Sequence, residues 1–200
     1  MVESAKAGKR VRDNPLGEAL DLDDAALDLL GDMFAETAAG IGLNGRAIFA
    51  RLRAGESMGQ ALALPAGLKD LLYARAHQWF SIGRHEKAEG LFRTLSLLDG
   101  SVADHWLGLG ICLRLKRQWE QAHSAFRSAA ALRPDWAIPH FHAMESFIRQ
   151  GDWQSARQSA QAFSERSQSN VPPALQKEAA RFQAAIDMRL NHPAAGGPAA

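Results

Sequence analysis

Three alanines recur at an even spacing along this chain. Ala88, Ala122 and Ala156 are separated by two steps of 34 residues, a period at which helix pairs repeat in stacked arrays. Phe92 and Phe126 each follow their alanine by four residues, so a longer unit repeats with it. A helix pair of this length cannot bury its own apolar face, and neighbouring pairs must stack to form a core. The spacing therefore predicts an all-α array of stacked helical hairpins.

The middle unit carries the fullest version of the repeat. Its small residues mark points where helices should touch closely, because a larger side chain there costs about 1–3 kcal/mol in overpacking. We expect three units, over 69–102, 103–136 and 137–170, which together form a tetratricopeptide-repeat superhelix. The residues of the middle unit that match the tetratricopeptide pattern are Trp106, Leu109, Gly110, Ala122, Phe126, Ala129 and Pro134.

Glycine marks the turn between paired helices in two of the units. Gly83 and Gly151 occupy equivalent positions, where glycine supplies the left-handed conformation that ends a helix. The middle unit has Arg117 there, so we expect its turn to be built in another way. Helices are predicted over 68–82, 85–98, 102–115, 119–132, 136–149 and 153–166, with a capping helix over 174–190.

The two ends of the chain differ from the repeats. Residues 1–45 form an N-terminal extension, which has a basic leader and weak periodicity up to residue 20, where we expect no fixed structure. An acidic amphipathic helix should begin at Asp23 or Asp24. The remaining expected segments are N-terminal helices within 46–68 (46–53 and 57–62), a C-terminal capping segment over 171–190, and a disordered tail over 191–200 that is rich in Pro, Ala and Gly.

Charge and composition exclude several classes of protein. The 23 lysines and arginines nearly cancel 22 acidic residues, which argues against a nucleic-acid partner or a membrane-surface role. No apolar run approaches the roughly 18 residues of a spanning helix, and the leader lacks the pattern of a secretory signal. The single cysteine, Cys112, lies among apolar residues and is expected to be a buried, inert thiol. These features favour a cytoplasmic protein without stable membrane insertion.

The sequence contains no recognisable catalytic or cofactor-binding motif. His140 and His142 form the closest histidine pair, but residues two apart on a helix point to different faces and are poorly placed to share a metal ion. A nucleotide-binding glycine loop, a metalloprotease motif and a nucleophile elbow are all absent from the sequence. We therefore expect a protein that is not an enzyme and that holds no cofactor or metal.

Function is expected on the concave side of the superhelix, which we call the inner face. It is lined by the first helix of each unit, at the second, fifth, ninth and twelfth positions of that unit. A groove that is mostly apolar and aromatic, with a few charges at its edges, suits extended proline-containing segments. A core role is an equal alternative for Leu107 and Ile111. The inner-face positions are Asp70, Tyr73, His77 and Phe80, then Asp104, Leu107, Ile111 and Arg114, and then Ile138, Phe141, Glu145 and Ile148.

Three stretches carry a resemblance to a known family. They read "LKDLLYARAHQWFSIGRHEKAEGLFRTLSLLDG", "HWLGLGICLRLKRQWEQAHSAFRSAAALRPDW" and "PHFHAMESFIRQGDWQSA". From about Phe49 to Leu190, the chain resembles the class II chaperones of bacterial type III secretion, which hold hydrophobic translocator proteins. The resemblance implies a non-enzymatic, cytoplasmic chaperone that binds an extended translocator segment in its groove and forms a homodimer through its N-terminal helices.

The same resemblance implies a set of peptide-binding residues. In the family, pockets for a short proline-and-leucine motif are lined by aromatic residues of the first unit and by residues of the second. Several family members have Phe or Tyr where this chain has His77 and His85. The residues carried over are Tyr73, His77, Phe80, His85, Leu98, Leu107, Ile111 and Phe126, and Arg114 joins them from its position on the inner face.

Other roles remain open at this point. A co-chaperone that grips a C-terminal carboxylate needs Lys, Arg or Asn on its inner face, and the presence of Tyr73, His77, Leu107 and Ile111 disfavours that role. A chaperone for another secretion component, such as the needle subunit, would present a similar apolar groove. An enzyme or a regulatory domain is a further alternative. A metal or nucleotide bound to the purified protein would support it.

Overall fold

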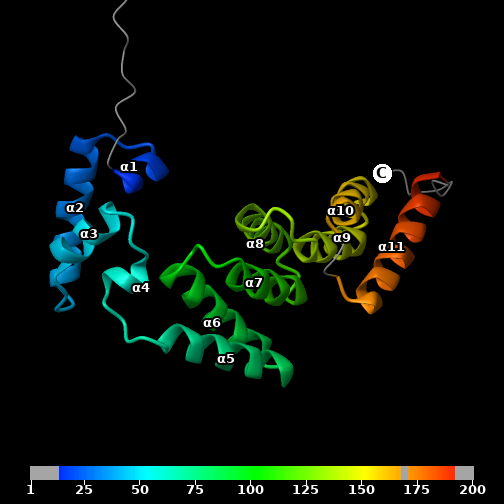
Figure 1. Ribbon diagram of the computed structural model, residues 1–200, viewed down its shortest axis with the longest axis horizontal. Coiled ribbons are helices and arrows are strands. Elements are labelled where there is room, and N and C mark those ends of the chain that lie inside the picture. Colours follow the sequence, from blue (N-terminus) through cyan, green and yellow to red (C-terminus); the bar gives the residue numbers. More distant parts are fainter. Residues whose placement is uncertain (1–13, 168–170, 192–200) are drawn as a thin grey trace, which may run out of the picture. The chain divides into compact units, whose positions relative to one another are not determined.

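The computed structural model describes residues 14–167 and 171–191. All regular secondary structure in these ranges is α-helical, which confirms the predicted fold class (Figure 1). The chain divides into two compact units, Met1–Ala66 and Gly67–Ala200, and we describe each by itself. Within the described ranges, no helix combines the length and the hydrophobicity needed to cross a membrane.

The second compact unit, Gly67–Ala200, contains the three repeats. Its helices pack in chain order, each against the next, so three hairpins and a closing helix share one continuous array. Every helix predicted for the repeats is present, with ends within two residues of those expected. The hairpins are α5 (Leu68–Ser81) with α6 (His85–Leu98), α7 (Ala103–Leu115) with α8 (Trp119–Leu132), and α9 (Ile138–Gln150) with α10 (Trp153–Arg166), followed by α11 (Pro173–Asn191).

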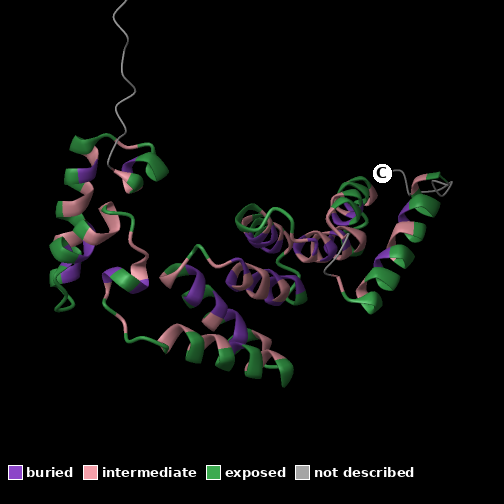
Figure 2. Cartoon of the chain, in the orientation of Figure 1, coloured by how far each residue is buried: buried purple, intermediate pink, exposed green. Residues whose placement is uncertain are grey.

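Two glycines on α7 hold the middle of this array together. A Cβ atom added at Gly108 would lie 2.5 Å from the ring of Phe92 on α6, and one added at Gly110 would lie 2.5 Å from the ring of Phe126 on α8. Real atoms do not approach so closely, so α7 can approach both neighbours only with glycine at these positions. Both phenylalanines are 2% exposed and belong to the core that Figure 2 shows on the packed sides of these helices.

The repeating alanines lie where the period predicts. Ala88, Ala122 and Ala156 are all fully buried, each near the start of the second helix of its hairpin. A methyl group there leaves room for the first helix of the same hairpin to pack closely. The predicted role of these small residues at helix contacts is confirmed.

The three hairpin turns have the same backbone conformation. Gly83 and Gly151 have φ values of 77° and 76°, as their sequence positions predict. Arg117 also has a positive φ, of 59°. Our expectation that the middle turn is built in another way is therefore wrong. The left-handed conformation costs a residue with a Cβ about 1–2 kcal/mol, which the packing of α7 against α8 must offset.

Equivalent hydrogen bonds close each of these turns. In every case the backbone N–H of the residue after the left-handed position donates to a carbonyl near the end of the first helix, so the helix end is satisfied in the same way. The three bonds are Arg84 N to Trp79 O at 2.8 Å, Gln118 N to Leu113 O at 3.0 Å, and Asp152 N to Phe147 O at 3.0 Å.

Four helices lie in the described residues of the first compact unit, 14–66. They are α1 (Pro15–Leu20), α2 (Asp24–Ala39), α3 (Gly45–Arg53) and α4 (Met58–Ala61). The helix α1 lies in a stretch where we expected no fixed structure, and that expectation is wrong for residues 15–20. It forms because Asn14 caps it, with the side-chain oxygen accepting from the N–H of Gly17, and because Pro15 suits a first helical position. The leader over 1–13 and the tail from 192 lie outside the described residues.

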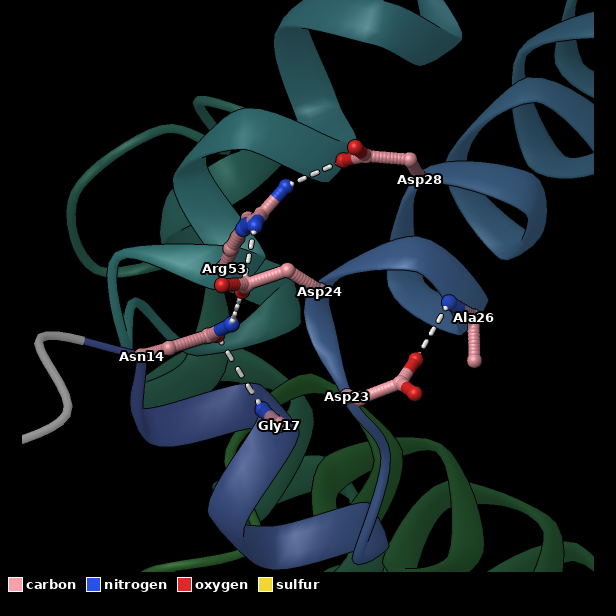
Figure 3. Close-up of polar contacts among 7 residues, drawn as sticks. All are labelled: Asn14, Gly17, Asp23, Asp24, Ala26, Asp28 and Arg53. Carbon is pink, nitrogen blue, oxygen red and sulfur yellow. Dashed lines mark hydrogen bonds and ion pairs between the residues drawn. The ribbon is translucent and has the colours of Figure 1, made fainter.

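The acidic helix α2 packs against the basic helix α3. Arg53 on α3 donates to Asp28 at 2.6 Å and to Asp24 at 2.8 Å (Figure 3). Arg46 lies 3.3 Å from Asp32. The side chain of Asp23 accepts from the N–H of Ala26, which confirms the expected start of α2. The boundary that we predicted between residues 45 and 46 falls just inside α3, which packs against α2, and the first compact unit ends at residue 66.

We expect Gly110→Ala to lower the free energy of unfolding by about 2 kcal/mol, because the added methyl group displaces the Phe126 ring. Gly90→Ala is the matched control. Gly90 is an exposed helical glycine with nothing within 4 Å of an added Cβ, so this change should raise stability by about 0.5–1 kcal/mol. Urea unfolding of the full chain, followed by circular dichroism, measures both. Equal stability of the two variants would contradict the packing described for α7.

We expect Arg117→Gly to raise the free energy of unfolding by about 1 kcal/mol, because glycine adopts the left-handed conformation without a steric cost. Gly151→Ala should have the opposite sign, since its φ is 76°. The same urea experiment compares the two variants. A destabilised Arg117→Gly protein would mean that the arginine side chain stabilises the turn by more than its backbone conformation costs.

Candidate functional site

The inner face is formed by half-buried side chains on α5 and α7. Tyr73, Phe80, Leu107 and Ile111 are each partly accessible and pack at the edge of the central core, which leaves part of each side chain available to a ligand. His77 is exposed. These two helices therefore present a surface that is mostly apolar and aromatic. None of the five residues named here is Asp, Glu, Lys or Arg.

Tyr73 lies at the centre of an aromatic cluster. Its ring centroid is 4.5 Å from that of His77, 5.8 Å from His105 and 6.1 Å from Phe92. Phe92 is buried, so the cluster connects the inner face to the core. The ring of Tyr73 is thereby fixed, so stacking a ligand on it would cost the protein little side-chain entropy.

A cavity of about 290 Å³ opens beside Tyr73. It lies between the N-terminal ends of α5 and α7, and Tyr73, a predicted peptide-binding residue, forms part of its wall. Sequence reasoning did not select His105, which occupies a buried position on α7 and carries no motif that would have marked it. The lining residues are Lys69, Asp70, Tyr73, Val102, Asp104 and His105.

A second cavity, of about 450 Å³, lies at the opposite ends of the same helices. His85, the first residue of α6, lines it together with Arg84, Lys87 and Lys116. The ring of Phe80 lies 5.1 Å from that of His85. Leu98 is the last residue of α6, about 20 Å along the helix from His85, so the structure does not bring these two predicted residues into one pocket.

Two of the predicted binding residues are buried. Phe126 is 2% exposed and packs on Gly110, so it supports the wall of the inner face but presents almost no surface to a ligand. Arg114 is 9% exposed, and its Nη1 lies 2.5 Å from a carboxylate oxygen of Glu145 on α9. The remaining predicted residues are at least partly accessible.

The ion pair of Arg114 places charge within the inner face and not only at its edges. Burial alone would raise the pKa of the Glu145 carboxyl, but His142, Arg114 and Arg149 surround it and lower its pKa to about 2. The carboxylate therefore stays ionised throughout the physiological pH range. The charged network thus joins Arg114 of the second repeat to Glu145 and its neighbours in the third repeat, whereas the accessible surface of α5 and α7 is mostly aromatic and aliphatic.

Two further titratable residues are the single cysteine and His140. Cys112 is buried, as predicted, and burial raises the pKa of its thiol to about 12, so it is an unreactive group at neutral pH. Burial also lowers the pKa of His140. Across residues 14–167 and 171–191, no three His, Cys, Asp or Glu side chains are grouped so that they would hold a metal ion.

No family model matches the chain, but searches of known sequences and structures find similar proteins. In sequence and in fold, the chain is similar to the class II translocator chaperones of type III secretion, whose solved members have tetratricopeptide-like folds.

The relatives are individually distant. The chaperone protein SicA of Salmonella typhimurium is 27% identical over 114 residues, which cover 57% of this chain and 69% of SicA. The chaperone SycD of Yersinia enterocolitica, solved with a peptide of the translocator YopD, shares the fold with a TM-score of 0.60 at 23% identity, covering 64% of this chain and 98% of SycD. PcrH, solved with the chaperone-binding region of PopD, has a TM-score of 0.58 at 25% identity and covers 66% and 97% of the two chains.

Proposed function

We propose that this protein is a non-enzymatic chaperone of type III secretion that binds an extended segment of a hydrophobic translocator. The observation that carries the proposal is the half-buried aromatic and aliphatic surface of α5 and α7, with the cavity beside Tyr73, in a fold that resembles chaperones solved with translocator peptides. Binding at this face would keep the apolar segment of the client away from water and from other copies of the client.

The physical character of the inner face suits such a client. Tyr73, Phe80, Leu107 and Ile111 offer apolar contact area on a rigid scaffold, so binding costs the protein little conformational entropy. Extended segments that contain proline lose little entropy themselves on docking. Affinity should then come from a few anchoring side chains.

Our proposal includes a location in the bacterial cytoplasm. A hydrophobic translocator is made there and must stay soluble until its export, which is when a chaperone of this kind is needed. A buried, unpaired Cys112 is compatible with a reducing compartment.

We also propose that the protein forms a homodimer through its N-terminal helices. Leu29 and Met33 on α2 are 64% and 59% exposed, and they lie one helical turn apart on the side opposite the buried Leu27. An apolar stripe of this kind is typical of a surface that another protein covers. A second copy would bury the same stripe of its own in a symmetric contact.

We expect Tyr73→Ala and Phe80→Ala each to weaken translocator binding by on the order of tenfold or more, because each change removes a fixed aromatic anchor. Isothermal calorimetry with a peptide from the chaperone-binding region of a translocator measures the affinity, and circular dichroism checks that helical content is unchanged. Leu97→Ala is the control, since Leu97 is an exposed apolar residue on α6. Unchanged affinity in both aromatic variants would show that the client binds elsewhere.

We expect the double variant Leu29→Lys with Met33→Lys to be monomeric, because two buried ammonium groups would face their copies across the contact. Light scattering on the full chain gives the mass of the particle. Met188→Lys, at a comparably exposed methionine on α11, should leave the dimer intact. A monomeric wild-type protein, or a double variant that remains dimeric, would refute the proposed interface.

A further inference from the structure

Three of the six residues that line the cavity beside Tyr73 carry side-chain hydrogen-bond acceptors, namely Asp70, Asp104 and His105. We propose that it binds a lysine or arginine side chain of the client, next to the apolar anchor, an inference that rests on the proposed chaperone function. His105, Asp70 and Asp104 all line the cavity. Their hydrogen-bond and ion-pair partners determine what the cavity can bind.

The side chain of His105 offers an acceptor to the cavity. Its Nδ1 lies 3.3 Å from the backbone oxygen of Asp99. Because a carbonyl oxygen can only accept, Nδ1 carries the proton and Nε2 keeps its lone pair. Burial lowers the pKa of the ring, which keeps it neutral at pH 7. The residue is only 5% exposed, and no group in the described part of the chain donates to Nε2.

The two carboxylates beside it have different partners. Asp104 pairs with Arg133 at 2.7 Å, on a surface where the guanidinium also lies 4.2 Å from the ring of Trp136. Asp70 is exposed and has no ion-pair partner among residues 14–167 and 171–191. The cation of the lining, Lys69, is already bound to Asp99 at 2.6 Å. The cavity therefore keeps an uncompensated negative charge at Asp70.

Tyr73 adds the surface that the stem of a long cationic side chain needs. Its ring is half-buried and forms one wall of the cavity, where methylene groups can pack and where a cation is attracted to the ring face. A volume of about 290 Å³ admits one such side chain. A client with an acidic residue at this position would meet like charges and unpaired acceptors, so the cavity selects against it.

The carboxylates also have a structural role, which does not account for the whole site. Asp70 and Asp104 lie in the first turns of α5 and α7, where negative charge stabilises a helix N-terminus. That role explains neither the acceptor of the buried His105 nor the open volume beside Tyr73. A basic side chain of the client would satisfy all of these groups together.

The test uses two short peptides and the full chain. The probes are acetyl-Leu-Pro-Lys-Pro-Leu-amide and the same peptide with norleucine in place of lysine, which differ only in the ammonium group. Binding is followed by the nuclear magnetic resonance signals of the His105 and Tyr73 rings. We expect the lysine peptide to bind about fivefold more tightly than the norleucine peptide. The variant Asp70→Asn with Asp104→Asn should abolish this preference, and Glu120→Gln, in the first turn of α8, should preserve it.

Each outcome decides the proposal. Equal affinity for the two peptides, or a preference that survives in the double Asp→Asn variant, would overturn it, as would a preference that disappears in the Glu120→Gln control. Because these probes need no translocator, the result is independent of the calorimetry on Tyr73→Ala and Phe80→Ala. The two experiments can also disagree. If the lysine peptide binds more tightly but Tyr73→Ala and Phe80→Ala still bind the translocator normally, the translocator does not bind at this face and the cavity does not serve it.

Discussion

The close contact of α7 with α6 and α8 is the constraint on which the rest of the compact unit Gly67–Ala200 depends. Gly108 lets the ring of Phe92, on α6 of the preceding hairpin, approach the backbone of α7, and Gly110 lets the ring of Phe126, on α8 of the same hairpin, do so. This contact fixes the distance between the first and second repeats, and so it also fixes where α5 and α7 meet. The cavity beside Tyr73 exists at that meeting point, which makes the packing of two phenylalanines a condition for the geometry of the candidate site.

The periodic part of the fold could be predicted from the sequence because each unit repeats the same physical demands. Small residues recur where helices touch, and glycine recurs where a helix must reverse. Arg117 shows the limit of this reasoning. Its turn has the backbone of the glycine turns, because the packing of the flanking helices dictates the conformation and the residue type only sets its cost. Residue type therefore predicted two turns correctly and the third wrongly.

Contacts between residues far apart in the sequence were harder to predict. The sequence shows an acidic stretch and, later, several arginines, but no period indicates that Arg53 bonds Asp24 and Asp28. The phase of the repeat places Arg114 and Glu145 on one face, yet it cannot show that they are buried as a pair. The helix period shows which way a side chain points. Its burial depends on which residues of the neighbouring repeats cover it.

The inner face therefore combines two kinds of contact with different consequences for specificity. Aromatic and aliphatic surface on α5 and α7 favours any apolar segment, and it is tolerant because such contacts have little directional preference. The ion pair of Arg114 with Glu145 and the acceptors around His105 are directional and are costly to leave unmatched. Because Arg114 and Glu145 already satisfy one another, the acceptors around His105 are the polar groups left to fix the register of a bound segment, since sliding by one residue would misplace the donor while hardly changing the apolar area.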